Sequence, residues 1–217
     1  MKYVKMLGLA AMAAMALMAF VGAGTASAKE GVLCSTTTNP CSSKWAVGTV
    51  LDFSAEESTP LEFTSGGLLN TCTGSTVKGK LTANPNGTGT ATGENTEITW
   101  TGCTHASTTI KNAAGNFGGL TVEKVAGTSN GTVRADGEIR VTIAGLFPGE
   151  NCVYGVTNGT HMGTLKEGNP ATMEANTIAT KITVAGDSCV FAPASALWKG
   201  KYVLTSPTGT TLSVSSS

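Results

Sequence analysis

Alternation of apolar and polar residues with a period of two is the feature that most constrains the fold of this chain. In VLDFSA, Leu51 and Phe53 fall on one face, and Asp52 and Ser54 on the other. Similar segments, each bounded by Gly, Asn or Pro, are PLEFTS, STVKGKLTA, EITWTGC, LTVEKVAG, GEIRVTIAG, CVYGVT, KITVAG, LWKGKYVL and TLSVS. Because successive side chains of a strand point to opposite faces, the pattern predicts sheets with one buried face. About nine or ten short strands with frequent turns predict an all-β antiparallel β-sandwich, Ig-like or jelly-roll-like.

The first 28 residues have the layout of a secretory signal peptide. Two lysines precede an apolar run, which ends in the small residues ASA. We expect a helical signal over residues 1–28 with cleavage between Ala28 and Lys29. Residues 29–217 would then form a single secreted domain, and the protein is predicted to be extracellular.

The charge of the mature chain excludes some partners. The predicted signal holds two of the 14 basic residues and none of the 14 acidic ones, which leaves a net charge of −2 without a basic cluster. Binding to nucleic acid or to an anionic membrane surface depends on clustered positive charge. We therefore expect neither partner, and the remaining candidates are cell-surface components or further copies of the chain.

An even number of cysteines in an exported chain predicts disulfides. The six lie after the signal, at Cys34, Cys41, Cys72, Cys103, Cys152 and Cys189. Loop-closure entropy favours pairing each with its nearest neighbour in sequence, although a crossed arrangement stays open. Zinc is the competing interpretation, but the chain has no CxxC pair and no His at ligand spacing, so we predict no metal.

Three Asn-Gly-Thr sequences predict hairpin turns. The Asn-Gly dipeptide suits the positive φ angles of a type I′ turn, and the first example would join STVKGKLTA to EITWTGC, with Cys72 and Cys103 closing the hairpin. The same tripeptide is also a glycosylation acceptor, so modification stays open at Asn86, Asn130 and Asn158.

Catalytic motifs are missing from the sequence. His105 and His161 are the only histidines, no GxSxG turn accompanies them, and both are expected in loops. Nearby acids are interpreted as solvated residues beside turns, with Glu94 and Glu97 on opposite faces of a regular strand. These acids are Glu56, Glu57, Glu94, Glu97, Asp136 and Glu138. We predict no enzymatic activity and no cofactor.

The three tryptophans are the remaining candidates for a binding site. Trp100 and Trp198 lie in alternating segments and are expected to be buried anchors of a core that is poor in aromatic residues. Trp45, near the Cys41 loop, is the one residue retained as a possible ligand contact.

Cysteines and strand-like Thr/Gly-rich sequence recur together in four segments, CSTTTNPC, GLLNTCTGSTVKGK, EITWTGC and SCVFAPASALWKGKYVLTSP. These segments resemble a group of exported bacterial Thr/Gly-rich, disulfide-containing β-proteins without assigned activity. A fainter likeness is to the secreted activator of alkane oxidation. The resemblance implies an extracellular β-protein and no particular site residue.

We expect a non-enzymatic structural or interaction role at the cell surface or in the extracellular matrix. The alternatives are a carbohydrate- or lipid-binding module and a glycan hydrolase with dispersed carboxylates.

Overall fold

The computed structural model describes residues 30–112, 114–147, 150–183 and 189–216, so the predicted signal peptide lies outside the described residues. These residues form fourteen strands. The strands are β1 (Val32–Cys34), β2 (Val50–Ala55), β3 (Leu61–Thr64), β4 (Leu68–Ala83), β5 (Ala91–Cys103), β6 (Ser107–Ile110), β7 (Gly119–Lys124), β8 (Gly131–Asp136), β9 (Ile139–Phe147), β10 (Glu150–Val156), β11 (His161–Lys166), β12 (Thr172–Ile182), β13 (Ser195–Ser206) and β14 (Ser213–Ser215). Nowhere in these ranges is there a helix long and apolar enough to cross a membrane.

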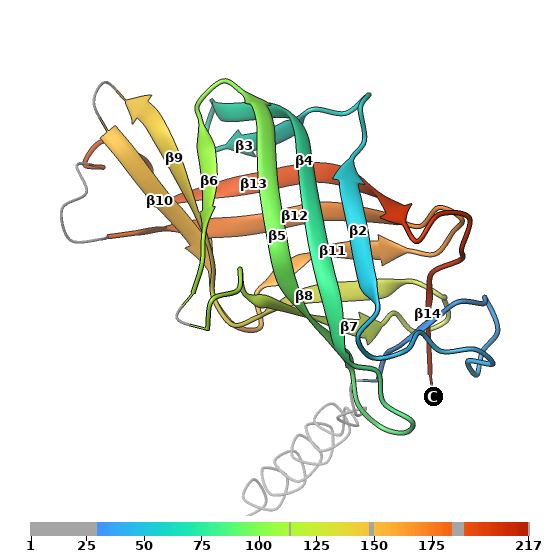
Figure 1. Cartoon of the computed structure of the whole chain (residues 1–217). Helices are drawn as coiled ribbons and strands as arrows, with labels where there is room; N and C mark the ends of the chain where they lie inside the picture. Colours follow the sequence, from blue (N-terminus) through green and yellow to red (C-terminus); the bar gives the residue numbers. More distant parts are fainter. Residues whose placement is uncertain (1–29, 113, 148–149, 184–188, 217) are drawn as a thin grey trace, which may run out of the picture.

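Eight of the strands form a closed antiparallel barrel. Their order around the barrel is β2, β4, β5, β7, β8, β11, β12 and β13, and β13 pairs again with β2. Figure 1 shows β4 and β5 crossing one side of the barrel, with β12 and β13 behind them. The inward faces of these strands make the core.

The predicted β-sandwich is therefore wrong, although the all-β class and the alternation are confirmed. Alternation shows only that each strand buries one face, and a sandwich and a barrel share that property. What separates them is the pairing of β2 with both β4 and β13, which joins the early and late parts of the chain and leaves no free edge in the ring.

Four long strands extend the barrel at one end. β3 lies between β4 and β13 there, while β12 continues beyond β11 to pair with β10, followed by β9 and β6. No ladder joins β5 to β6, and side chains connect them instead. Trp100 Nε1 on β5 donates to Thr109 Oγ1 on β6 at 2.8 Å, and Asn70 Nδ2 on the neighbouring strand β4 donates to Ser107 Oγ on β6 at 2.9 Å. The extension thus surrounds a continuation of the same core beyond this end of the barrel.

The disulfides follow the sequential pairing that loop-closure entropy favours. They join Cys34 to Cys41, Cys72 to Cys103 and Cys152 to Cys189. Three disulfides in one chain indicate that the protein works in an oxidising environment. The hairpin of β4 and β5 is confirmed as well, with Cys72 opposite Cys103 in the ladder.

The predicted type I′ turns are wrong. Such a turn needs positive φ at both central residues, and no described residue other than glycine has one. Of the glycines in the three Asn-Gly pairs, Gly87 and Gly131 do not have a positive φ angle. Gly159 is in the left-handed region, at +80°. Asn130 accepts a hydrogen bond from the Glu167 main chain at 3.0 Å, so its side chain holds neighbouring loops together.

A two-stranded ribbon of β1 and β14 closes one end of the barrel (Figure 1). Leu33, Leu212 and Val214 are almost completely buried and belong to the same core cluster as the barrel residues Leu81 and Leu165. Gly131 allows this approach, because a Cβ at that position would lie only 2.7 Å from Cγ2 of Val214. We call the β1–β14 pair the floor of the barrel.

Candidate ligand cavity

A cavity of about 200 Å³ lies inside the barrel. Most of the residues that line it near the floor are aliphatic, and most of its aromatic lining residues lie farther from the floor. Lining residues include Leu51, Leu81, Val133, Leu165 and Leu212 near the floor, and Phe63, Trp100, Tyr154, Trp198 and Tyr202 farther from it. Met162 and Met173, the two methionines that follow the predicted signal, both line it, and the thioether chain of methionine adapts readily to the shape of a neighbour.

Small residues at inward positions account for the open space. Gly79 stands between the inward residues Val77 and Leu81 on β4, and Ala175 and Ala179 face inward from β12. A Cβ at Gly79 would meet only ordinary contacts, 3.7 Å from the Glu94 carbonyl oxygen and 4.0 Å from Asn95 Oδ1. Protein cores normally contain few voids larger than a water molecule, so this volume is a feature of the fold.

The aromatic wall presents carbon to the cavity because several of its polar atoms are bonded elsewhere. Tyr154 packs edge-on to Phe63 with ring centroids 4.8 Å apart, and its hydroxyl donates to the Pro193 carbonyl at 2.9 Å. Trp100 packs edge-on to Trp198 at 4.7 Å, and its indole N–H donates to Thr109. The expectation that Trp100 and Trp198 are core anchors agrees with this packing.

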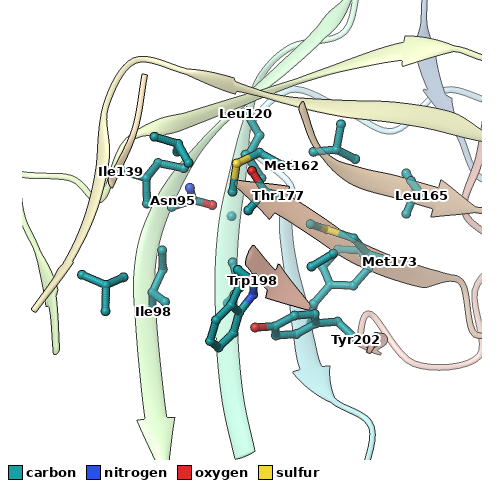
Figure 2. Close-up of a pocket in the computed structure, with 18 of the residues that line it drawn as sticks. Asn95, Ile98, Leu120, Ile139, Met162, Leu165, Met173, Thr177, Trp198 and Tyr202 are labelled. Carbon is teal, nitrogen blue, oxygen red and sulfur yellow. The ribbon is translucent and has the colours of Figure 1, made fainter. Parts of the chain in front are cut away.

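Two polar side chains lie in the wall at mid-height. Thr177 on β12 is 4% exposed, and its hydroxyl has no hydrogen-bond partner within the described part of the chain. Asn95 on β5 is 2% exposed and lies four strands away around the ring, on the opposite wall. Figure 2 shows both side chains beside Met162. Sequence reasoning missed both residues.

Trp45, the predicted ligand contact, lies outside the set of residues that line the cavity. It is half-buried against the cluster that contains the floor, and its main chain accepts a hydrogen bond from Asn84 Nδ2 at 2.9 Å. Its role as a contact stays a prediction, because the arrangement neither joins it to the cavity nor excludes a separate site.

The structure does not gather the histidines and acids into one site. His105 is half-buried after β5, whereas His161 begins β11 and is exposed, rather than lying in a loop as expected. Several acids form ion pairs with neighbouring bases at 2.6 to 2.8 Å; these are Glu56 with Lys201, Glu97 with Lys78, and Glu138 with Arg140. The hydrogen bond from Lys201 lowers the pKa of the Glu56 carboxyl.

The expectation that Glu94 and Glu97 face opposite sides is wrong. A β-bulge places Glu97 opposite Lys78 and Glu94 opposite Lys80, with Asn95 opposite Gly79. Because the bulge adds one residue to β5, the simple odd-and-even rule for facing directions fails across it. The same bulge helps to direct Asn95 inward.

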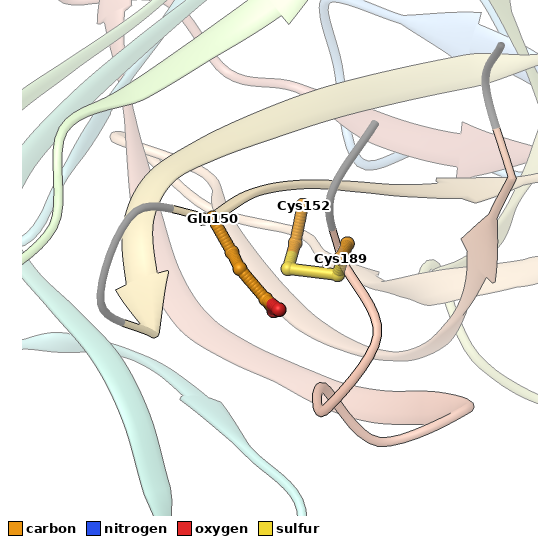
Figure 3. Close-up of side chains that lie close together, drawn as sticks. All are labelled: Glu150, Cys152 and Cys189. Atoms are coloured by element: carbon orange, nitrogen blue, oxygen red, sulfur yellow. A yellow bond between two sulfur atoms is a disulfide. The ribbon is translucent and has the colours of Figure 1, made fainter. Parts of the chain in front are cut away.

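Glu150 lies beside the Cys152–Cys189 disulfide (Figure 3). The carboxylate and the two sulfurs lie within 4.8 Å of one another, a spacing that a metal ion could bridge. Thiolates bind metals, however, and both sulfurs here are bonded to each other. Glu150 is 7% exposed and its Oε2 has no partner among the described residues, so the cluster offers one carboxylate in the oxidised protein.

Burial of Tyr202 predicts a loss of stability at high pH. Burial raises the pKa of Tyr202 to about 12 from 10.0, despite the nearby Ser75 and Trp198 side chains, which act in the opposite direction. The unfolded chain therefore releases this proton first as the pH rises, and the neutral form stabilises the fold fully only below pH 10. We expect the free energy of unfolding to fall between about pH 10 and 12, by up to about 1.4 kcal/mol per pH unit for this group.

Denaturant titrations of the wild type and of Tyr202→Phe at several pH values measure this contribution. Tyr154, whose pKa burial also raises to about 12, makes Tyr154→Phe the comparison variant, and the double variant should have the smallest pH slope. An unchanged slope in the double variant would contradict the assignment.

Together, the fold and the cavity define a class: a disulfide-bonded antiparallel β-barrel with an apolar interior cavity. No protein-family model, curated protein sequence or solved structure matches this chain. The resemblance to exported bacterial β-proteins therefore stays a prediction, and the cavity is the feature that bears on function.

Proposed function

We propose that the protein is secreted and binds a small apolar molecule inside its barrel, without acting on it chemically. The cavity of about 200 Å³ carries this proposal. An apolar cavity of about 150 Å³ is large enough to take up benzene. This cavity therefore suits a ligand with one ring, or a short aliphatic chain of similar volume. Of the functions expected from the sequence, the proposal is nearest to the lipid-binding alternative.

Extracellular action is supported by two independent observations. The first 28 residues have the layout of a signal peptide, and three disulfides are typical of an oxidising compartment. Closure of the barrel also weakens the case for a structural role through self-association, because a closed ring leaves few strand edges for another copy to pair with.

Toluene is a suitable first probe, since it has one ring and no polar group. In ¹⁵N–¹H NMR titrations of the mature chain we expect a Kd of roughly 0.1 to 1 mM, with shifts concentrated on residues that line the cavity. Gly79→Leu should raise the Kd at least tenfold, because the added side chain occupies the space that the ligand needs.

Two variants separate loss of space from other effects. Gly79→Ala adds only a Cβ that fits and should keep binding within about threefold. Gly67→Leu adds the same leucine at an exposed position where a Cβ meets nothing within 4 Å. Toluene shifts that are absent from the wild type, or that persist unchanged in folded Gly79→Leu, would overturn the proposal.

A further inference from the structure

The polar atoms around the cavity differ in whether they already have a hydrogen-bond partner in the protein. Trp100 Nε1 and the Tyr154 hydroxyl have protein partners, as described above. Asn70, which also lines the cavity, donates to the His105 carbonyl and accepts from the His105 main-chain N–H, each at 2.9 Å. Because these groups already form hydrogen bonds within the protein, they are poorly suited to bind a ligand.

Thr177 differs from them, because its hydroxyl is buried and unpartnered. It lies opposite Trp198 in the β12–β13 ladder, so it faces the interior beside the aromatic wall. Burying a hydroxyl without a hydrogen bond is unfavourable, because the group loses its bonds to water. A group on a ligand that bonds to Thr177 would remove that cost, and the apolar surroundings would strengthen the bond.

Asn95 approaches the same level of the cavity from the opposite wall (Figure 2). Its main chain is held by Gly118 and Phe117, with hydrogen bonds of 2.8 and 3.0 Å, so the strand fixes its position. A carboxamide both donates and accepts, and it therefore suits a neutral polar group. The two side chains give the cavity one polar level in an otherwise apolar interior.

At the level of Thr177 and Asn95, no charged group of a described residue points into the cavity. Among the described residues, Lys80 is the only charged one that borders the cavity, and its side chain is exposed, since Gly79 and Leu81 on either side of it point inward. A carboxylate or ammonium group in the cavity would have to lose its hydration without an opposite charge to replace it.

We infer that the ligand is a neutral molecule with one hydrogen-bonding group, a hydroxyl or a carbonyl, on an otherwise apolar body, and that Thr177 binds that group. This inference rests on the proposed function, because it assigns the chemistry of the molecule that the cavity holds.

Toluene and phenol test it, because they have nearly the same shape and differ by a methyl and a hydroxyl group. Thr177→Val, which replaces the hydroxyl with a methyl group, should raise the Kd of phenol about fivefold to tenfold and leave that of toluene within about twofold. Thr177→Ser keeps the hydroxyl and should keep the wild-type ratio of the two Kd values. Benzoate should bind at least tenfold more weakly than phenol.

The outcomes separate the two proposals. If both probes bind the wild type and Thr177→Val changes their Kd values equally, the assignment of Thr177 fails while the binding function stands. Benzoate that binds as tightly as phenol would overturn the neutral character of the ligand. If neither toluene nor phenol binds to the wild type, the proposed function itself fails.

Discussion

Replacing Cys152 and Cys189 together by alanine is expected to lower the free energy of unfolding by about 4 kcal/mol. The cysteines are 37 residues apart, and the segment between them includes β11 and β12, two neighbouring strands of the barrel wall. Without the disulfide the unfolded chain gains the freedom of this whole loop. Urea denaturation of the wild type and the double variant under identical conditions measures the difference.

The Cys34–Cys41 disulfide provides a matched comparison. Its cysteines are only 7 residues apart, so the same entropy relation predicts a loss of about 2 kcal/mol for the Cys34→Ala, Cys41→Ala variant. Equal losses in the two variants would show that loop length does not determine the contribution of these disulfides. A loss below about 1 kcal/mol for the longer loop would contradict its stabilising role.

Leu212→Ala is expected to destabilise the protein by about 3 kcal/mol or more. Leu212 is fully buried, directly precedes the floor strand β14 and lines the cavity. Truncating it removes apolar contacts and enlarges a space that the surrounding strands cannot close. Thermal and urea denaturation, each monitored by tryptophan fluorescence, measure this loss of stability.

Val190→Ala is the control for this substitution. Val190 is 72% exposed, and a change there should stay within about 0.5 kcal/mol. If Leu212→Ala were as mild as Val190→Ala, the β1–β14 ribbon would be a loosely attached segment and the barrel would not depend on its floor.

The inward faces of most strands could be predicted from alternation alone. Alternation places Leu51 and Phe53 on one face of their strand, and it predicts that Trp100 and Trp198 are buried. All four line the interior. Loop-closure entropy favoured the correct disulfide pairing, although the sequence left a crossed arrangement open. Alternation is a local property of each strand, so a single sequence is sufficient to show it.

The part of the cavity wall formed by β12 could not be predicted from the alternation of apolar and polar residues. In β12 the inward positions hold Ala175, Thr177 and Ala179, whereas Ile178 points outward and is 61% exposed. The apolar pattern of this strand is therefore weak and partly reversed. A hydrophobic alternation rule overlooks such a strand, yet its small and polar inward residues make the open space.

By itself, the sequence determined the strand class and the buried face of most strands, because the alternation lies within each strand, and it favoured the sequential disulfide pairing. Only the tertiary structure decided that the sheet closes into a barrel. Closure depends on contacts such as Ala55 with Tyr202 and Val50 with Lys80, between segments far apart in sequence. The cavity follows from that closure, since Gly79 and Asn95, which are neighbours in the β4–β5 hairpin, face Thr177 only when their strands surround a common interior.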